Sequence, residues 1–135
     1  IFLLRRHPRE PVLLSCRNKI SDMETMQQTE PAPGMCVIWS TVPPSRSEDL
    51  AQRLIDKDLV ACVNITPVRS LYRWKGEACD DREHLLIMKT KKSLADAVIR
   101  ALQSMHPYEV PEIIVLPVSA AHPPYLAWVQ EETRD

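Results

Sequence analysis

The residues His106-Pro107-Tyr108-Glu109-Val110-Pro111-Glu112 join a regular helical pattern to the apolar run Ile113-Ile114-Val115-Leu116. Each proline fixes its own φ and disfavours helix in the residue before it, so His106 and Val110 are expected to be extended. A rigid, polar connector of this kind is a common place for a binding site. The alternative is that the two prolines only end a helix and start a strand.

Two amphipathic helices are predicted from apolar residues at three- and four-residue spacing. The first covers 46–58, with Ser45 as N-cap and Glu48 completing a capping box. The second ends at Met105, with Ser93 and Asp96 as its cap. Its apolar face is the most regular in the chain and consists of Leu94, Ala97, Val98, Ala101, Leu102 and Met105.

Four strands are predicted around these helices. They cover 36–42, 61–74, 84–88 and 113–118. Within the second strand Pro67 indicates a bulge or an edge position, and Lys75-Gly76 is typical of a hairpin turn. The run 84–88 is almost wholly apolar, which predicts burial on both sides. A short helix begins at Pro123-Pro124 and carries Tyr125, Trp128 and Val129 on one face.

The resulting order is β-α-β-β-α-β with a C-terminal helix, an α+β ferredoxin-like sandwich. Two helices then cover one face of the sheet, while the other face has no cover except the N-terminal segment or the last helix. This shortage predicts an oligomer in which the hairpin carrying Tyr72 and Trp74 reaches a neighbour. The alternative is that both aromatic residues pack within their own subunit.

Composition fits one ordinary globular domain, at 135 residues with 44% hydrophobic and 26% charged residues. A net charge of −1 argues against nucleic-acid binding, and no apolar run is long enough for a transmembrane segment. The folded domain is expected over 35–135. Residues 1–34 are expected to be a disordered tail or a targeting remnant, since their first twenty residues hold five basic side chains and one acidic side chain.

The cysteines predict the compartment. Cys16, Cys36, Cys62 and Cys79 show no zinc-site spacing, and three of them fall in the expected domain. Scattered free thiols favour a cytoplasmic protein. If the basic N-terminus is a targeting remnant, the alternative is a mitochondrial or secretory location.

Several motifs in this order resemble the CutA family of divalent-cation tolerance proteins over about residues 36–130. They are Ala61-Cys62-Val63-Asn64, Tyr72-Arg73-Trp74-Lys75-Gly76, Lys89-Thr90, the segment 106–112 and Tyr125-Leu126-Ala127-Trp128. The resemblance implies a ferredoxin-like homotrimer that is similar in architecture to PII signalling proteins. It also implies that Tyr72, Trp74 and Trp128 contribute to a trimer arm.

The family resemblance raises the possibility of copper or another divalent cation as a cofactor. In bacterial members of the family, copper binding is described through a cysteine in the first strand and two adjacent histidines. Here the corresponding positions hold Ser40 and Met105-His106, which leaves His106 as the one expected metal ligand. Imidazole, hydroxyl and thioether form a poorer Cu(II) set than a thiolate with two imidazoles. The alternative is a histidine bonded to backbone at a helix end.

A second site is predicted where Lys89 ends a buried strand, because a buried ammonium needs a partner. Glu83, His106, Tyr108 and Glu109 are expected to converge with it. By the family resemblance these residues line a cleft between subunits, and we expect it to take a small anionic or polar ligand. The alternative is an intersubunit network of salt bridges without a ligand.

Three functions follow from these patterns. The family implies a non-enzymatic trimer in the response to metal ions. The alternative is a scaffolding protein that assists membrane anchoring or processing of a partner such as acetylcholinesterase, to which animal members have been linked. An enzyme using Ser40, His106 and Glu109 is disfavoured, because Ser40 lacks a nucleophile elbow and no acid is placed to orient His106.

Overall fold

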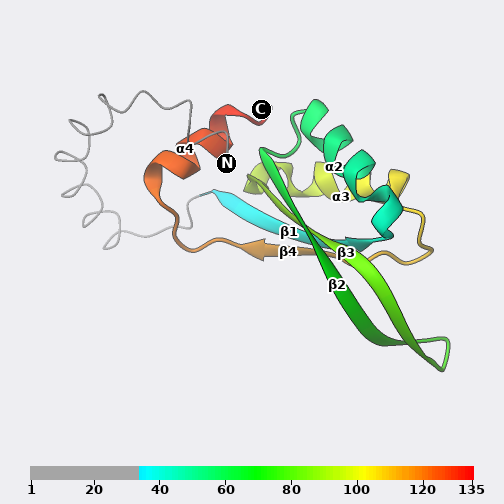
Figure 1. Cartoon of the computed structure of the whole chain (residues 1–135). Helices are drawn as coiled ribbons and strands as arrows, with labels where there is room; N and C mark the ends of the chain where they lie inside the picture. Colours follow the sequence, from blue (N-terminus) through cyan, green and yellow to red (C-terminus); the bar gives the residue numbers. More distant parts are fainter. Residues whose placement is uncertain (1–33) are drawn as a thin grey trace. The chain divides into compact units, whose positions relative to one another are not determined.

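This computed structural model describes residues 34–135. In this part, four strands pair into one antiparallel sheet in the order β2-β3-β1-β4, and α2 and α3 lie on one of its faces (Figure 1). The strands are β1 (Met35–Val42), β2 (Cys62–Trp74), β3 (Glu77–Lys91) and β4 (Ile113–Pro117). The helices are α2 (Ser47–Asp56), α3 (Ala95–Met105) and α4 (Pro123–Glu131). The predicted α+β class and element order are confirmed.

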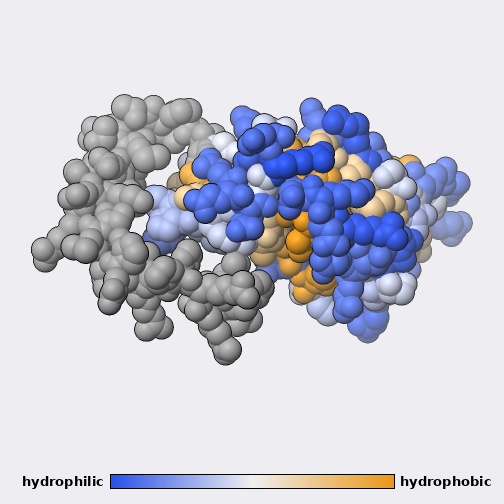
Figure 2. All heavy atoms as spheres, turned by 90° about the horizontal axis from the view of Figure 1, so that it is seen from above, coloured by the Kyte–Doolittle hydropathy of each residue, from blue (hydrophilic) through white to orange (hydrophobic). Residues whose placement is uncertain are grey.

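The hydrophobic core lies between the sheet and the two helices. Alternate residues of β1 point into it, and Ile38 is opposite Met88 on β3 and Val115 on β4. The helices contribute Leu50, Leu54, Val98 and Leu102, all fully buried. Seen from above these helices, the outer surface is largely hydrophilic, with a narrow hydrophobic strip (Figure 2). The helical spacing of the sequence therefore identified these four positions as core-facing, whereas Ile55, on the same predicted face, is 37% exposed.

Both long helices begin differently from the prediction. A 3₁₀ turn, η2 (Pro44–Arg46), precedes α2, and neither it nor α2 has a side-chain cap. A second 3₁₀ turn, η3 (Lys92–Leu94), contains Ser93 and precedes α3, again without a side-chain cap. The predicted capping box at Ser45 and the predicted cap at Ser93 are therefore both wrong. The tight turns supply backbone partners at the helix starts, so the expected side-chain caps are not needed.

The hairpin of β2 and β3 is longer and more regular than predicted. Its register is constant from Cys62 opposite Lys89 to Trp74 opposite Glu77, so Pro67 makes no bulge. Pro67 is tolerated because β2 is an edge strand of this sheet. The hairpin extends well beyond the other strands (Figure 1). We call its outer part, residues 68–83, the arm.

The turn at the end of the arm has positive φ at both central residues. Lys75 has φ 49° and Gly76 has φ 82°, which is the pattern of a type I′ turn. Such a turn matches the twist of the two strands, so it confirms the predicted hairpin connection. At positive φ a lysine is energetically less favourable than a glycine, because its Cβ crowds the backbone, and also less favourable than an asparagine.

The second face of the sheet is uncovered over much of its area. Trp39 and Ile114 are opposite each other across β1 and β4, and are 38% and 42% exposed. Leu116 is exposed beside them at 38%. On β3, Leu86 is buried by the helices, whereas Ile87 is only half-buried, so the predicted burial on both sides is wrong within one chain. We call this surface the open face.

Two predictions concern other parts of the chain. The tail predicted at residues 1–34 lies outside the described residues, apart from Gly34. Between residues 34 and 135, no helix combines the length and the apolar character needed to cross a membrane.

Candidate functional site

A cleft of about 820 Å³ lies between the arm and the segment 106–112, which we call the connector. Four acidic side chains contribute to it: Asp81, Glu83, Glu109 and Glu112. Three aromatic side chains also line it: Tyr72, Trp74 and Tyr108. On the arm, Tyr72, Trp74, Asp81 and Glu83 share one face because side chains alternate along each strand and these positions pair in register. On the other side of the cleft, His106 is extended before the first proline, as predicted, and the connector then bends over residues 108–110.

Glu83 and Tyr108 join the two walls. The Tyr108 hydroxyl donates a hydrogen bond to Glu83 Oε2 at 2.9 Å. Glu83 is only 6% exposed. Burial, followed by the hydrogen bond to Glu83, raises the pKa of Tyr108 well above its usual range, so the phenol stays protonated. The structure thus brings together Glu83 and Tyr108, two of the residues that were expected to converge.

A second tyrosine–carboxylate pair lies further out on the arm. The Tyr72 hydroxyl donates to Asp81, and this bond raises the pKa of Tyr72 to about 12. Arg69 also borders the cleft, but its guanidinium makes two bonds to Asp80, at 2.9 and 2.7 Å. Register places Asp80 on the opposite face of the arm from Asp81. The charge of Arg69 is therefore directed away from the acidic face.

His106 is fixed by hydrogen bonds at both ring nitrogens. Nε2 lies 2.9 Å from the carbonyl oxygen of Thr41, and Nδ1 accepts from the backbone N–H of Tyr108 at 3.1 Å. A carbonyl can only accept, so Nε2 carries the proton and the ring is neutral. Burial lowers the pKa of His106, in agreement with this state. The alternative of a backbone-bonded histidine fits this geometry, although as a neutral ring.

The residues around His106 do not fit a metal centre within one chain. Its Nδ1 lone pair is used by Tyr108, and its Nε2 is protonated. Ser40 is fully buried in the core, and Met105 packs against the core cluster. Among residues 34–135, no three His, Cys, Asp or Glu side chains are grouped to hold a metal ion. The predicted metal role of His106 therefore has no geometric support here.

Lys89 lies away from the cleft, contrary to the expected convergence. It is six residues from Glu83 along β3, about 20 Å by the rise of a strand. Its ammonium is 3.9 Å from the sulfur of Cys62 on the neighbouring strand. Within one chain the cationic group expected to bind an anion is thus missing from the cleft. Glu109 does border the cleft, and it contacts Lys75 rather than Lys89.

Trp128 is also distant from the arm in its own chain. It lies on α4, where its ring is 5.6 Å from that of Tyr125. The residues that follow α4 bind Lys91 at the far end of β3 from the hairpin turn. A joint role of Trp128 with Tyr72 and Trp74 would therefore need a second copy of the chain.

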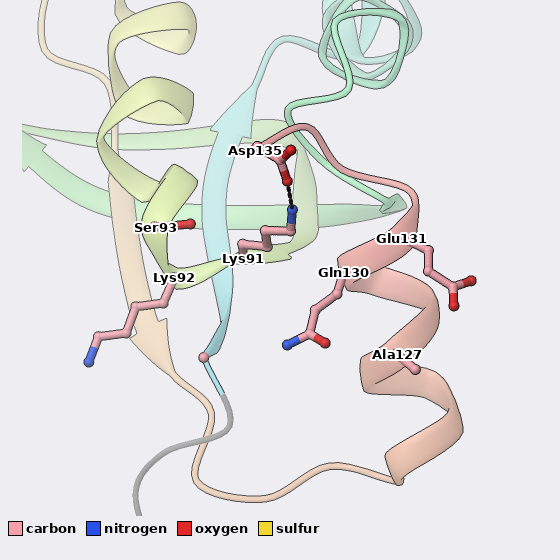
Figure 3. A pocket seen from close by; sticks show the side chains of 8 residues that line it. Lys91, Lys92, Ser93, Ala127, Gln130, Glu131 and Asp135 are labelled. Carbon is pink, nitrogen blue, oxygen red and sulfur yellow. Dashed lines mark ion pairs between the residues drawn. The ribbon is translucent and has the colours of Figure 1, made fainter.

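A second hollow, of about 780 Å³, lies beside the end of β3 and α4 (Figure 3). Lys91 reaches across it to the carbonyl oxygens of Thr133 and Arg134, at 3.1 and 3.0 Å, and to Asp135 at 3.6 Å. Lys92 points away from Asp135 (Figure 3). Since Lys91 is already satisfied, this hollow is explained by the attachment of the last residues to the sheet.

Asp81, Tyr72 and Glu112 were not expected in the ligand cleft. The alternation of the arm is a signal that could have found Asp81, because it shares strand parity with Glu83. The location of the cleft also depends on how the connector folds against the arm. That contact joins residues far apart in sequence, so no local pattern reveals it.

Comparison with known proteins identifies the family. The model of the CutA1 divalent ion tolerance protein matches residues 36–132. The chain is 44% identical over 88 residues to Protein CutA of Mus musculus, covering 64% of this chain and 50% of that protein. It is 39% identical over 99 residues to the divalent-cation tolerance protein CutA of Thermus thermophilus, covering 72% of this chain and 96% of that protein.

A plant relative and two solved structures agree with this result. Protein CutA 1, chloroplastic, of Oryza sativa is 40% identical over 115 residues, covering 84% of this chain and 63% of its own length. The chain thus spans about half to two thirds of several curated relatives. The PII-like protein CutA from Nostoc, in apo form, is 36% identical with a TM-score of 0.72, covering 73% of this chain and 97% of its own. CutA1 from Oryza sativa is 41% identical with a TM-score of 0.72, covering 75% and 94%. The chain belongs to the CutA1 divalent ion tolerance family.

Proposed function

We propose that this protein is a non-enzymatic homotrimer that acts in the response to divalent metal ions and binds a small ligand in the cleft that each subunit forms between its arm and its connector. The observation that carries the proposal is the juxtaposition of a preformed cleft with an open apolar face. A cleft of several hundred Å³ lined by polar and aromatic groups is typical of small-molecule sites. The metal response is proposed from the family, including the name of the Thermus thermophilus relative.

The open face supports the homotrimer. Trp39, Ile114 and Leu116 form an exposed apolar surface on a sheet whose other face is buried. Exposed patches of this kind mark interaction surfaces in soluble proteins. The projecting arm gives each subunit a means to contact a neighbour with Leu71, which is 69% exposed. The similarity to a PII-like CutA structure agrees with an oligomer.

The arrangement of the ionisable groups supports a role without catalysis. A histidine that acts as a base needs a free nitrogen near the reacting group. Both nitrogens of His106 are engaged, and Ser40 lies fully buried in the core. Glu109 contacts Lys75 at the hairpin turn. Of the three residues considered for catalysis, His106 and Glu109 are therefore engaged in other contacts, and Ser40 is shielded by burial.

We further propose a cytoplasmic location. Within the described residues, Cys36, Cys62 and Cys79 are all free, which suits a reducing compartment. The scaffolding alternative is not favoured, because the family model and the Thermus thermophilus name both refer to divalent ions or cations.

The metal-response proposal can be tested by complementation. A bacterial host lacking its own family member would be grown on graded copper and zinc with this chain, with an Ile114→Lys variant and with an empty vector. We expect the wild type to extend growth to higher metal concentrations, and the variant to lose the effect if assembly is needed. Equal growth with the chain and the empty vector would refute the metal-response role.

Metal binding is tested separately by copper titration of the purified protein beside His106→Ala. We expect no tight site that depends on His106. If a micromolar copper site is present and is lost in His106→Ala, the neutral ring can give up one of its two hydrogen bonds to bind the metal.

A further inference from the structure

We propose that the cleft between the arm and the connector binds a small organic cation, an amine or guanidinium compound, rather than an anion or a bare metal ion. The proposal rests on the ligand-binding role given to this cleft above and names the chemical class of its ligand. Three observations carry it: the sign of the charge, the aromatic walls and an ammonium of the chain itself at the edge of the site.

The charge of the cleft is negative on the face that meets the ligand. Glu83 is only 6% exposed. Within the described residues, its carboxylate accepts one hydrogen bond, from the Tyr108 hydroxyl to Oε2. A buried carboxylate normally requires a cationic partner. Arg69 is turned to Asp80, and Lys89 lies far along β3, so neither neutralises Glu83. A ligand with positive charge would supply the missing partner.

The aromatic walls suit an organic cation. Tyr72, Trp74 and Tyr108 line the cleft and keep 45%, 38% and 37% exposure. Aromatic faces attract ammonium and guanidinium groups, and several together form the cages that recognise such ligands. Glu83 and Asp81, which accept hydrogen bonds from the Tyr108 and Tyr72 hydroxyls, add the counter-charge. Neither feature favours an anionic ligand.

Lys75 already makes both kinds of contact at the outer edge of the site. Its ammonium lies 5.5 Å from the centre of the Trp74 ring and 3.5 Å from Glu109 Oε2. The Lys75 side chain is 68% exposed, so a ligand could displace it readily. The Lys75 ammonium thus makes the contacts proposed for the cationic ligand and would compete with it for them.

The volume and the spacing of the acids favour an organic ligand over a metal ion. The cleft measures about 820 Å³, which suits a molecule of many atoms. Among residues 34–135, no three potential ligand side chains are grouped closely enough for a metal ion. The acids are instead distributed over both walls, on the arm and on the connector.

The test is calorimetric titration of the full chain with cadaverine, an amine, and with methylguanidinium at physiological salt, which screens non-specific attraction. Glutamate, ATP and copper(II) are titrated in parallel. We expect saturable binding of an organic cation, weakened at least about tenfold in Glu83→Gln because the charge of a buried partner is lost. Lys75→Asn should strengthen binding, since it removes the competing ammonium and suits the positive φ of the turn.

Glu48→Gln is the matched control, because Glu48 is exposed on α2 and does not line the cleft. It should bind like the wild type. The proposal is overturned if neither organic cation binds saturably, if glutamate, ATP or copper binds the cleft instead, or if Glu83→Gln and Glu48→Gln behave alike. Melting curves identify a Glu83 variant that fails to fold, and Lys75→Asn then decides. Light scattering on the same samples separates the two proposals, since a trimer that binds no cation refutes only the ligand class.

Discussion

Replacing Ile114 by lysine tests whether the open face is the assembly surface. Ile114 is 42% exposed in the single chain, opposite Trp39. Full burial of an isoleucine stabilises by about 1.5–3 kcal/mol, so burying the exposed part contributes about 1 kcal/mol per subunit. Each new ammonium on a covered face would add several kcal/mol of desolvation cost. The total penalty for a trimer is therefore on the order of 10 kcal/mol, enough to dissociate it at micromolar concentration.

The assay is light scattering coupled to size exclusion, with sedimentation velocity as a second measure. We expect the wild type at about three times the chain mass of 15.5 kDa and the Ile114→Lys variant at the single mass. Ile55→Lys is the matched control, since Ile55 is 37% exposed but lies on α2, on the helix side. It should keep the wild-type mass. A wild type of single mass, or an Ile114→Lys variant that keeps the trimer, would refute the reasoning.

The remaining predictions concern single residues. Because the pKa of His106 is lowered in the folded protein, its contribution to the free energy of unfolding is complete above pH 6.5, the pKa of an ordinary histidine. This contribution falls as the pH drops from 6.5 towards the folded pKa, because the unfolded state then binds the proton more strongly. His106→Gln should flatten this part of a pH series of denaturant melts. Ser40→Ala should raise the free energy of unfolding by about 1 kcal/mol, because the buried Ser40 hydroxyl has no partner within residues 34–135. Thr90→Val should instead lower it by about 1–3 kcal/mol, because the Thr90 hydroxyl donates to the Leu59 carbonyl at 2.6 Å; equal signs for the two hydroxyl deletions would contradict the hydrogen-bond assignment. Lys75→Asn should raise the melting temperature slightly, since asparagine tolerates φ 49° better than lysine, and an unchanged or lower value would count against a strained turn.

The fold class, the order of elements and the family all follow from the amino-acid sequence alone. Helical spacing in the second amphipathic segment and alternation in the first strand reflect burial on one side, so the spacing of apolar residues is enough to assign Val98, Leu102 and Ile38 to the core. The connector is recognisable because two prolines restrict the backbone locally. Glu83 and Tyr108, both expected in the ligand site from the sequence, lie in contact through a hydrogen bond.

The chemistry of the site, by contrast, depends on tertiary contacts. Lys89 is an exception: it lies about 20 Å from Glu83 because both residues belong to one extended strand, so the strand rise alone keeps them apart within one chain. Whether His106 is free to bind a metal depends on the Thr41 carbonyl, 65 residues away in sequence. The negative charge of the cleft follows from the alternation of side chains along the paired strands. This alternation places Arg69 and Asp80 on one face of the arm and Asp81 and Glu83 on the other. Local patterns report which side of an element is buried, whereas long-range pairing selects the residues that meet there. The charge of the cleft, on which the proposal of a cationic ligand rests, therefore comes from the tertiary structure.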